Sequence, residues 1–157
     1  GRRARRASHA RRADVARPGT PPLTHKTPLP PIEQETTMAN AKETLPKLME
    51  IDGCVGCCIV DSNSGMMLGA SGGGPISLEV AAAGNTEVVR SKRKTMKALN
   101  LNDQIEDMLI TLGRQYHLIR PLSSNDALFI YVVLDKSKAN LAMARHQLTQ
   151  IEKDLVV

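Results

Sequence analysis

All three cysteines of this chain lie within five positions, in the segment CVGCC at residues 54–58. Two thiolates at the spacing of Cys54 and Cys57 can share a metal ion or form a reactive dithiol. The third possibility is that the thiols are core side chains, because free cysteine packs as a small hydrophobe. Which of these three possibilities applies depends on the secondary structure around the segment.

Metal binding and redox chemistry both lack the neighbours they need. A zinc site takes about four ligands, but no second cysteine pair follows, and His117 and His146 stand alone in the sequence. A thioredoxin-like dithiol lies at the start of a helix, whereas CVGCCIVDS has apolar residues on both faces before Asp61 and predicts a strand covered on both sides. We therefore expect core cysteines and no metal site. A thiol redox protein that uses Cys54 and Cys57 is kept as an alternative function.

Alternation along this strand predicts which side chains share a face. One face is expected to carry Val55, Cys57 and Ile59, and the other Gly56, Cys58 and Val60.

No other segment has the spacing of an active site. The glycine-rich GASGGGP at 69–75 has Pro75 and Ile76 where a phosphate-binding loop needs Lys and Ser or Thr. Residues 69–73, GASGG, match the letters of a Gly-x-Ser-x-Gly nucleophile motif, but no paired acid–base spacing accompanies them. His117 lies in a predicted strand, where a packed or surface histidine is the usual occupant. We expect no catalytic residue, no cofactor and no enzyme activity.

The net charge of +5 belongs to one end of the 157-residue chain. Residues 1–37 carry eight Arg or Lys and three Asp or Glu, whereas residues 38–157 carry thirteen of each. No run approaches the roughly 20 apolar residues of a membrane helix, and no apolar stretch follows the first arginines as in a secretory signal. The sequence thus predicts a cytoplasmic protein without membrane contact.

Residues 1–37 and 38–157 are predicted to form separate units. The first is rich in Arg, Pro and Thr and poor in large apolar residues, so we expect a disordered tail. An arginine-rich arm of this kind suits nucleic-acid binding, a membrane surface or an organellar transit segment. The abrupt change of character at Met38 favours a fourth interpretation, a translated leader that is not native protein. Nucleic-acid binding through this tail is the second alternative function; the body, with 2% aromatic residues, offers few platforms for stacking bases.

From Met38 onward the hydrophobic periodicity predicts three helices and five strands. The expected helices cover 40–53, 77–100 and 139–155, and the expected strands cover 54–62, 66–71, 105–113, 116–122 and 127–135. The order is α-β-β-α-β-β-β-α. Short connections between consecutive strands indicate an antiparallel sheet with helices on both faces, in the α+β class.

The segment IDGCVGCCIVDSNSGMMLGAS, with the long Ala-rich helix and EDMLITLGRQYHLIRPL after it, resembles the roadblock family of dynein light chains and their bacterial relatives. Gly53, Gly56, Asp61 and Gly65 stand at the positions that the family's first two strands share, and the resemblance covers about residues 41–155. It implies a roadblock/profilin-like fold. It also implies a non-catalytic adaptor or regulator that binds a small Ras-like GTPase or another signalling protein.

The long middle helix carries two stripes at helical spacing. Small residues form the first, Ala81, Gly84, Val88, Ser91 and Thr95, and bulkier ones form the second, Leu78, Ala82, Val89, Met96 and Leu99. Two stripes indicate two packing partners, the second stripe facing the sheet; one wide buried face is the alternative.

The resemblance implies that the first stripe packs on a second copy of the chain, because proteins of the roadblock family form homodimers through this helix and the third strand. The dimer interface would then comprise the first stripe with Ile105, Met108 and Ile110. The basic residues Arg90, Arg93, Lys94 and Lys97 form an outer cluster that we expect to meet an acidic protein surface.

Overall fold

The computed structural model describes residues 30–155, and of residues 33–39 it describes the backbone alone. The predicted tail therefore lies outside the described residues over positions 1–29. The elements follow the predicted order: α1 Pro31–Met49, β1 Cys54–Asp61, β2 Met66–Gly72, α2 Leu78–Ala98, β3 Met108–Thr111, β4 Gln115–Pro121, β5 Leu128–Asp135 and α3 Leu141–Asp154.

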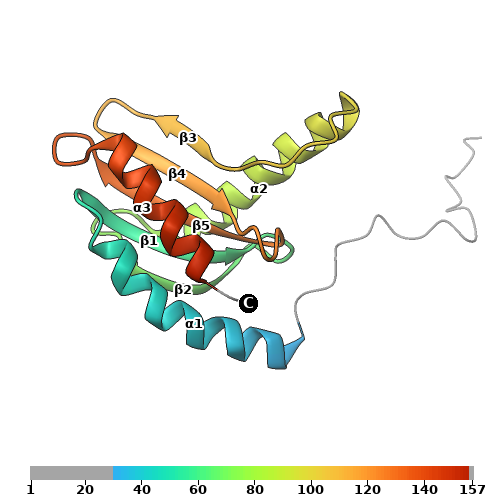
Figure 1. Ribbon diagram of the computed structural model, residues 1–157, viewed down its shortest axis with the longest axis horizontal. Coiled ribbons are helices and arrows are strands. Elements are labelled where there is room, and N and C mark those ends of the chain that lie inside the picture. Colours follow the sequence, from blue (N-terminus) through green and yellow to red (C-terminus); the bar gives the residue numbers. More distant parts are fainter. Residues whose placement is uncertain (1–29, 156–157) are drawn as a thin grey trace, which may run out of the picture.

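The five strands form one antiparallel sheet in the order β2-β1-β5-β4-β3. Helices α1 and α3 lie on one face of this sheet, and α2 lies on the other (Figure 1). The predicted α+β class and the helices on both faces are confirmed. Because β5 and β1 occupy the centre, their side chains are covered on both sides, which explains why these two segments are apolar without alternation.

Helix α1 begins at Pro31, well before the expected start at Asn40. Proline suits the first turn of a helix, since its missing N–H has no partner to lose there. The helix also continues through Pro46, which is exposed, because its other side is fixed to the sheet by Leu45 and Leu48.

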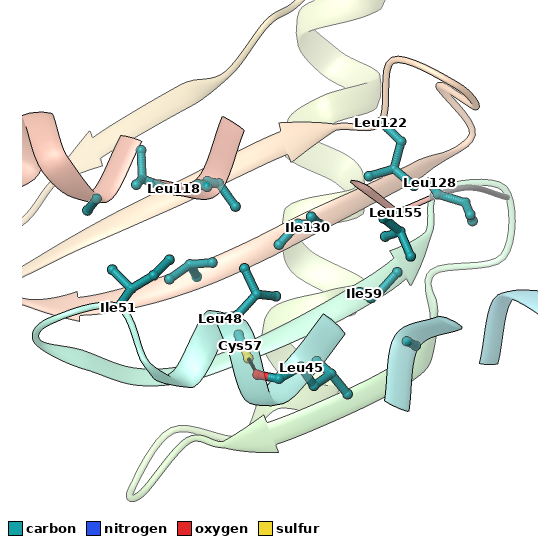
Figure 2. Packing of buried hydrophobic residues seen from close by; sticks show 14 of the residues in the cluster. Leu45, Leu48, Ile51, Cys57, Ile59, Leu118, Leu122, Leu128, Ile130 and Leu155 are labelled. Carbon is teal, nitrogen blue, oxygen red and sulfur yellow. Dashed lines mark hydrogen bonds between the residues drawn. The ribbon is translucent and has the colours of Figure 1, made fainter. Parts of the chain in front are cut away.

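Two clusters of buried side chains fill the space on the two sides of the sheet. The α1/α3 cluster contains Ala41, Leu45, Leu48, Ile51, Cys57, Ile59, Leu118, Leu122, Leu128, Ile130, Val132, Leu134, Ala144, Leu148 and Leu155. Figure 2 shows leucines of α1 and Leu155 pointing onto the strand residues of this cluster. The α2 cluster contains Cys58, Val60, Leu78, Ala82, Val89, Ile119, Phe129, Tyr131 and Val133.

The prediction for Val55 is wrong. Val55 packs against the α2 cluster rather than on the face of Cys57 and Ile59. The reason is an irregularity in β1, whose pairing with β5 shifts register between Cys54 and Gly56. One extra residue in a strand reverses the alternation beyond it, so Cys54 joins Cys57 on the α1/α3 side.

Three other elements refine the prediction. Ser77 caps α2, its hydroxyl accepting a hydrogen bond from the N–H of Val80 at 3.3 Å. Strand β3 begins at Met108, so the predicted Ile105 precedes it. In α3 the apolar stripe of Leu141, Ala144, Leu148, Ile151 and Leu155 is buried or half-buried, but so is Glu152, a charged residue that the hydrophobic pattern does not single out.

Candidate interaction surface

The small-residue stripe of α2 faces away from the protein's own core. The helix buries Leu78, Ala82, Thr86 and Val89 against the sheet. In contrast, Gly84, Val88, Ser91 and Thr95 are exposed, and only Ala81 packs against the edge of the α2 cluster. A Cβ atom added to Gly84 would have no atom within 4 Å. The wide-buried-face alternative is therefore wrong for the single chain.

The predicted second stripe packs against the sheet only over the first part of the helix. Met96 is half-buried, and Leu99, just beyond the end of α2, is 61% exposed. The buried residues of α2 end at Val89, and Figure 1 shows the rest of the helix continuing past the sheet. The prediction for Leu99 is wrong because the sheet is shorter than the helix. The second stripe does not include Thr86, which is nevertheless buried. Its polar hydroxyl can be buried because it donates a 2.7 Å hydrogen bond to the carbonyl of Ala82 within the helix.

The four basic residues of the predicted outer cluster on α2 divide into two pairs. The guanidinium of Arg90 donates a 2.7 Å hydrogen bond to the Asn63 carbonyl in the β1–β2 turn. That of Arg93 donates a bond of the same length to the Asp126 carbonyl before β5. These two arginines fasten the helix to turns at the end of the sheet, and their part in an outer cluster that meets a partner stays a prediction. Lys94 and Lys97 are exposed.

Strand β3 forms one edge of the sheet beside α2's face. Among the described residues it pairs with β4 alone, with Ile110 opposite His117. Met108 packs against the α2 cluster, and Ile110 is 37% exposed. Ile105 lies half-buried in the connection before the strand. Since α2 packs chiefly over β1 and β2, it leaves the β3 side of this face free for another element.

A cavity of about 940 Å³ separates the C-terminal end of α2 from the turn between β4 and β5. Its lining includes Met96 and Lys97 from α2, Asp103 and Glu106 from the following connection, and Lys153 from α3. Charges of both signs alternate around it, which suits a polar protein surface better than a single small anion.

His117 makes hydrogen bonds through both ring nitrogens. Its Nε2 lies 2.9 Å from Oε1 of Gln115, and its Nδ1 lies 2.9 Å from the hydroxyl of buried Tyr131. The rings of His117 and Tyr131 meet edge to face, with centroids 5.5 Å apart. Burial lowers the pKa of His117, because the charged form loses hydration. The residue is thus a packed histidine, as the sequence predicts.

The three cysteines are free thiols in different surroundings. Cys57 and Cys58 are fully buried, one on each side of the sheet, and Cys54 is half-buried at the start of β1. A hydrogen bond with Cys57 lowers the pKa of Cys54 and raises that of Cys57. Burial alone raises the pKa of Cys58 to about 12. Cys57 and Cys58 are therefore core side chains, whereas Cys54 has partial access to solvent.

Residues 30–155 contain no group of three or more His, Cys, Asp or Glu side chains arranged to hold a metal ion. No helix within that range has the length and apolar character needed to span a membrane.

No protein-family model matches this chain, and no curated protein matches it in sequence. Solved structures do match its fold. The gliding protein MglB of Thermus thermophilus aligns with a TM-score of 0.65 at 15% identity, over 76% of this chain and 87% of that one. MglB of Myxococcus xanthus gives 0.61 at 13% identity, over 76% and 90%. A Roadblock/LC7 domain from Streptomyces avermitilis gives 0.60 at 9% identity, over 74% and 92%. The described part of this chain therefore has the roadblock fold, of the kind found in these bacterial proteins.

Proposed function

We propose that this chain is a non-catalytic homodimeric adaptor or regulator that binds a partner protein, a small Ras-like GTPase or another signalling protein. One observation carries the proposal. Most of the small-residue stripe of α2 is exposed on the side of the sheet where Met108 of β3 also packs, and the edge strand β3 has no second neighbour among the described strands. Small side chains let a second helix approach closely, and a bare edge strand needs a cover.

A two-fold dimer would supply both a second helix for the stripe and a cover for the edge strand β3. The same patch on each subunit would meet its own copy, so the helix stripe would pack on the helix stripe and β3 would lie beside β3. The proposed interface is made of Ala81, Gly84, Val88, Ser91, Thr95, Ile105, Met108 and Ile110. Val88 and Ile110, at 38% and 37% exposure, supply the apolar area that such a contact would bury.

Lys94 and Lys97 of α2 are the proposed contact for the partner. Lys94 and Lys97 are exposed and lie beyond Val89, where the buried residues of α2 end. Arg90 and Arg93 contribute charge there, and each also donates one hydrogen bond to a turn carbonyl. Two lysines on a projecting helix favour a partner with an acidic surface.

Affinity capture from native lysate tests this function. The full chain is immobilised and challenged in GDP and in a non-hydrolysable GTP analogue. We expect recovery of a GTPase that depends on the nucleotide, and weaker recovery by Lys94→Glu/Lys97→Glu. The matched control is Lys42→Glu/Lys47→Glu, the same charge change on exposed positions of α1 across the sheet. Equal recovery by both variants would exclude the lysine pair as the contact, and failure of every bait to recover a GTPase or signalling protein would contradict the function.

A further inference from the structure

Cys54 and Cys57 lie on the same side of the sheet. Cys54 pairs with Leu134 and Cys57 with Val132, so three steps along β1 match two steps along β5. Their side chains consequently both join the α1/α3 cluster, about two strand rises apart, or about 7 Å. Without the register shift the two thiols would point to opposite faces.

A third sulfur reaches this pair from another element. Met49 is the last residue of α1, and its Sδ lies 3.7 Å from Sγ of Cys54. Its methyl group occupies the space above Gly72, where an added Cβ would lie only 2.9 Å from it. The glycine therefore leaves room for the thioether to lie over the start of β1.

The two thiols are hydrogen-bonded to each other, and Sγ of Cys54 also lies 3.7 Å from the carbonyl oxygen of Gly56. Cys57 also contacts a main-chain oxygen, its Sγ lying 3.9 Å from the carbonyl of Leu45 (Figure 2). That contact is long for a hydrogen bond and leaves the sulfur available to a stronger partner.

We propose that Cys54, Cys57 and Met49 bind one soft, monovalent metal ion of the Cu(I) type. Thiolate and thioether sulfur select such ions, which accept two or three ligands and need no carboxylate or imidazole. Zinc is disfavoured because the described residues offer no further His, Cys, Asp or Glu to complete four ligands.

The binding step is balanced without a change of oxidation state. Two metal–thiolate bonds form, two thiol protons are released to solvent, and Met49 adds as a neutral ligand. The ion has a route of entry, because Cys54 and Met49 are half-exposed while Cys57 lies beneath. A disulfide fits less well, since two parallel side chains about 7 Å apart at Cα are at the upper limit for a direct S–S bond.

Competition with a coloured Cu(I) chelator tests the proposal. The reduced full chain is titrated anaerobically with Cu(I) in the presence of bicinchoninate. We expect the wild type to withhold one equivalent per chain from the chelator. Cys54→Ser, Cys57→Ser and Met49→Leu should each weaken this binding at least tenfold. Cys58→Ser is the matched control and should bind as the wild type does, because Cys58 points to the α2 cluster on the opposite face.

Two results would overturn the site. One is a wild type that withholds no copper, and the other is a Cys58→Ser variant that loses as much affinity as Cys54→Ser. Circular dichroism checks that each variant is folded. Should Cys57→Ser unfold, alkylation of the wild type gives an independent answer: one equivalent of Cu(I) should protect Cys54 from iodoacetamide, as read by mass spectrometry, and unchanged labelling would refute the proposal.

Discussion

The carboxylate of Glu152 accepts a 2.8 Å hydrogen bond from the hydroxyl of Ser123 and another from the N–H of the same residue. Arg120 completes the set, with Nε 3.4 Å from the second carboxylate oxygen. Glu152 is 1% exposed, so a charge in the last turns of α3 is buried where these three donors meet it. The arrangement fixes the end of α3 to the connection between β4 and β5, beside the cavity below α2.

Removing this carboxylate should destabilise the fold. Glu152→Ala leaves the guanidinium of Arg120 half-buried without its partner, and we expect a loss of about 1–3 kcal/mol in the free energy of unfolding. Glu152→Gln, which keeps an acceptor oxygen, should lose less. Urea unfolding followed by circular dichroism measures both. Asp154→Ala, an exposed acid two residues further on, is the control and should stay within about 0.5 kcal/mol of wild type.

His117 should make stability fall in mild acid. Burial lowers the pKa of His117 in the folded chain, so near its ordinary value of about 6.5 the unfolded chain binds more protons than the folded one. The free energy of unfolding should therefore decrease as the pH falls through 6.5 toward the lowered folded value, and this histidine should have no effect on the pH dependence well above 6.5.

Urea midpoints at a series of pH values between 5 and 8 measure that slope. His117→Gln should reduce it, since an uncharged amide can still bond the Tyr131 hydroxyl but cannot titrate. His146→Gln changes an exposed histidine of α3 and should keep the wild-type slope. An undiminished slope in His117→Gln would show that other groups cause the acid sensitivity.

Periodicity is sufficient to predict the order of elements, because β5 and the buried stripe of α3 have unbroken apolar patterns. Periodicity fails where a local irregularity or a long-range contact determines which side chains are buried. Val55 changes face through a register shift that no residue type signals. Glu152 is buried by donors from β4 and the turn after it, about thirty positions earlier. The exposure of Leu99 depends on where the sheet ends, which the helix sequence does not contain.

The same limits apply to the candidate surface. The spacing of Gly84 and Val88 is sufficient to predict a small-residue stripe, and the structure places it outside the core. The engagement of Arg90 and Arg93 could not be predicted, since their acceptors are main-chain carbonyls of two separate turns. Sequence patterns identify side-chain character, but carbonyl direction is set by the folded backbone.

The thiols should react in the order of their exposure and pKa. Cys54 is half-buried and has a lowered pKa, whereas burial raises the pKa of Cys58 to about 12. At pH 8 iodoacetamide should modify Cys54 first and Cys58 only after unfolding. Because the pKa of Cys54 is lowered, the rate at this thiol should level off at a lower pH than the rate of an unperturbed cysteine in a short peptide. Time-resolved peptide mass spectrometry measures this, and early labelling of Cys58 in the folded chain would contradict the assignment.

Added bulk on the α2 stripe should break the proposed dimer without harming the single chain. The Cβ of Gly84→Leu meets no atom within 4 Å in the protomer, and leucine favours a helix over glycine by about 1 kcal/mol. Any loss of assembly must then come from contacts between copies, at about 1–3 kcal/mol of overpacking on each side of a two-fold interface. Ala83→Leu adds bulk at an exposed neighbouring position outside the stripe and should leave the dimer intact.

Light scattering coupled to size-exclusion chromatography measures the oligomeric state of each variant. We expect a dimer for the wild type and for Ala83→Leu at micromolar concentration, and monomer with some aggregate for Gly84→Leu, because β3 would then lose its cover. A dimeric Gly84→Leu variant would move the interface away from this stripe while keeping the dimer. A monomeric wild type would contradict the dimer itself, and with it the proposal that the partner meets a surface shared by two subunits.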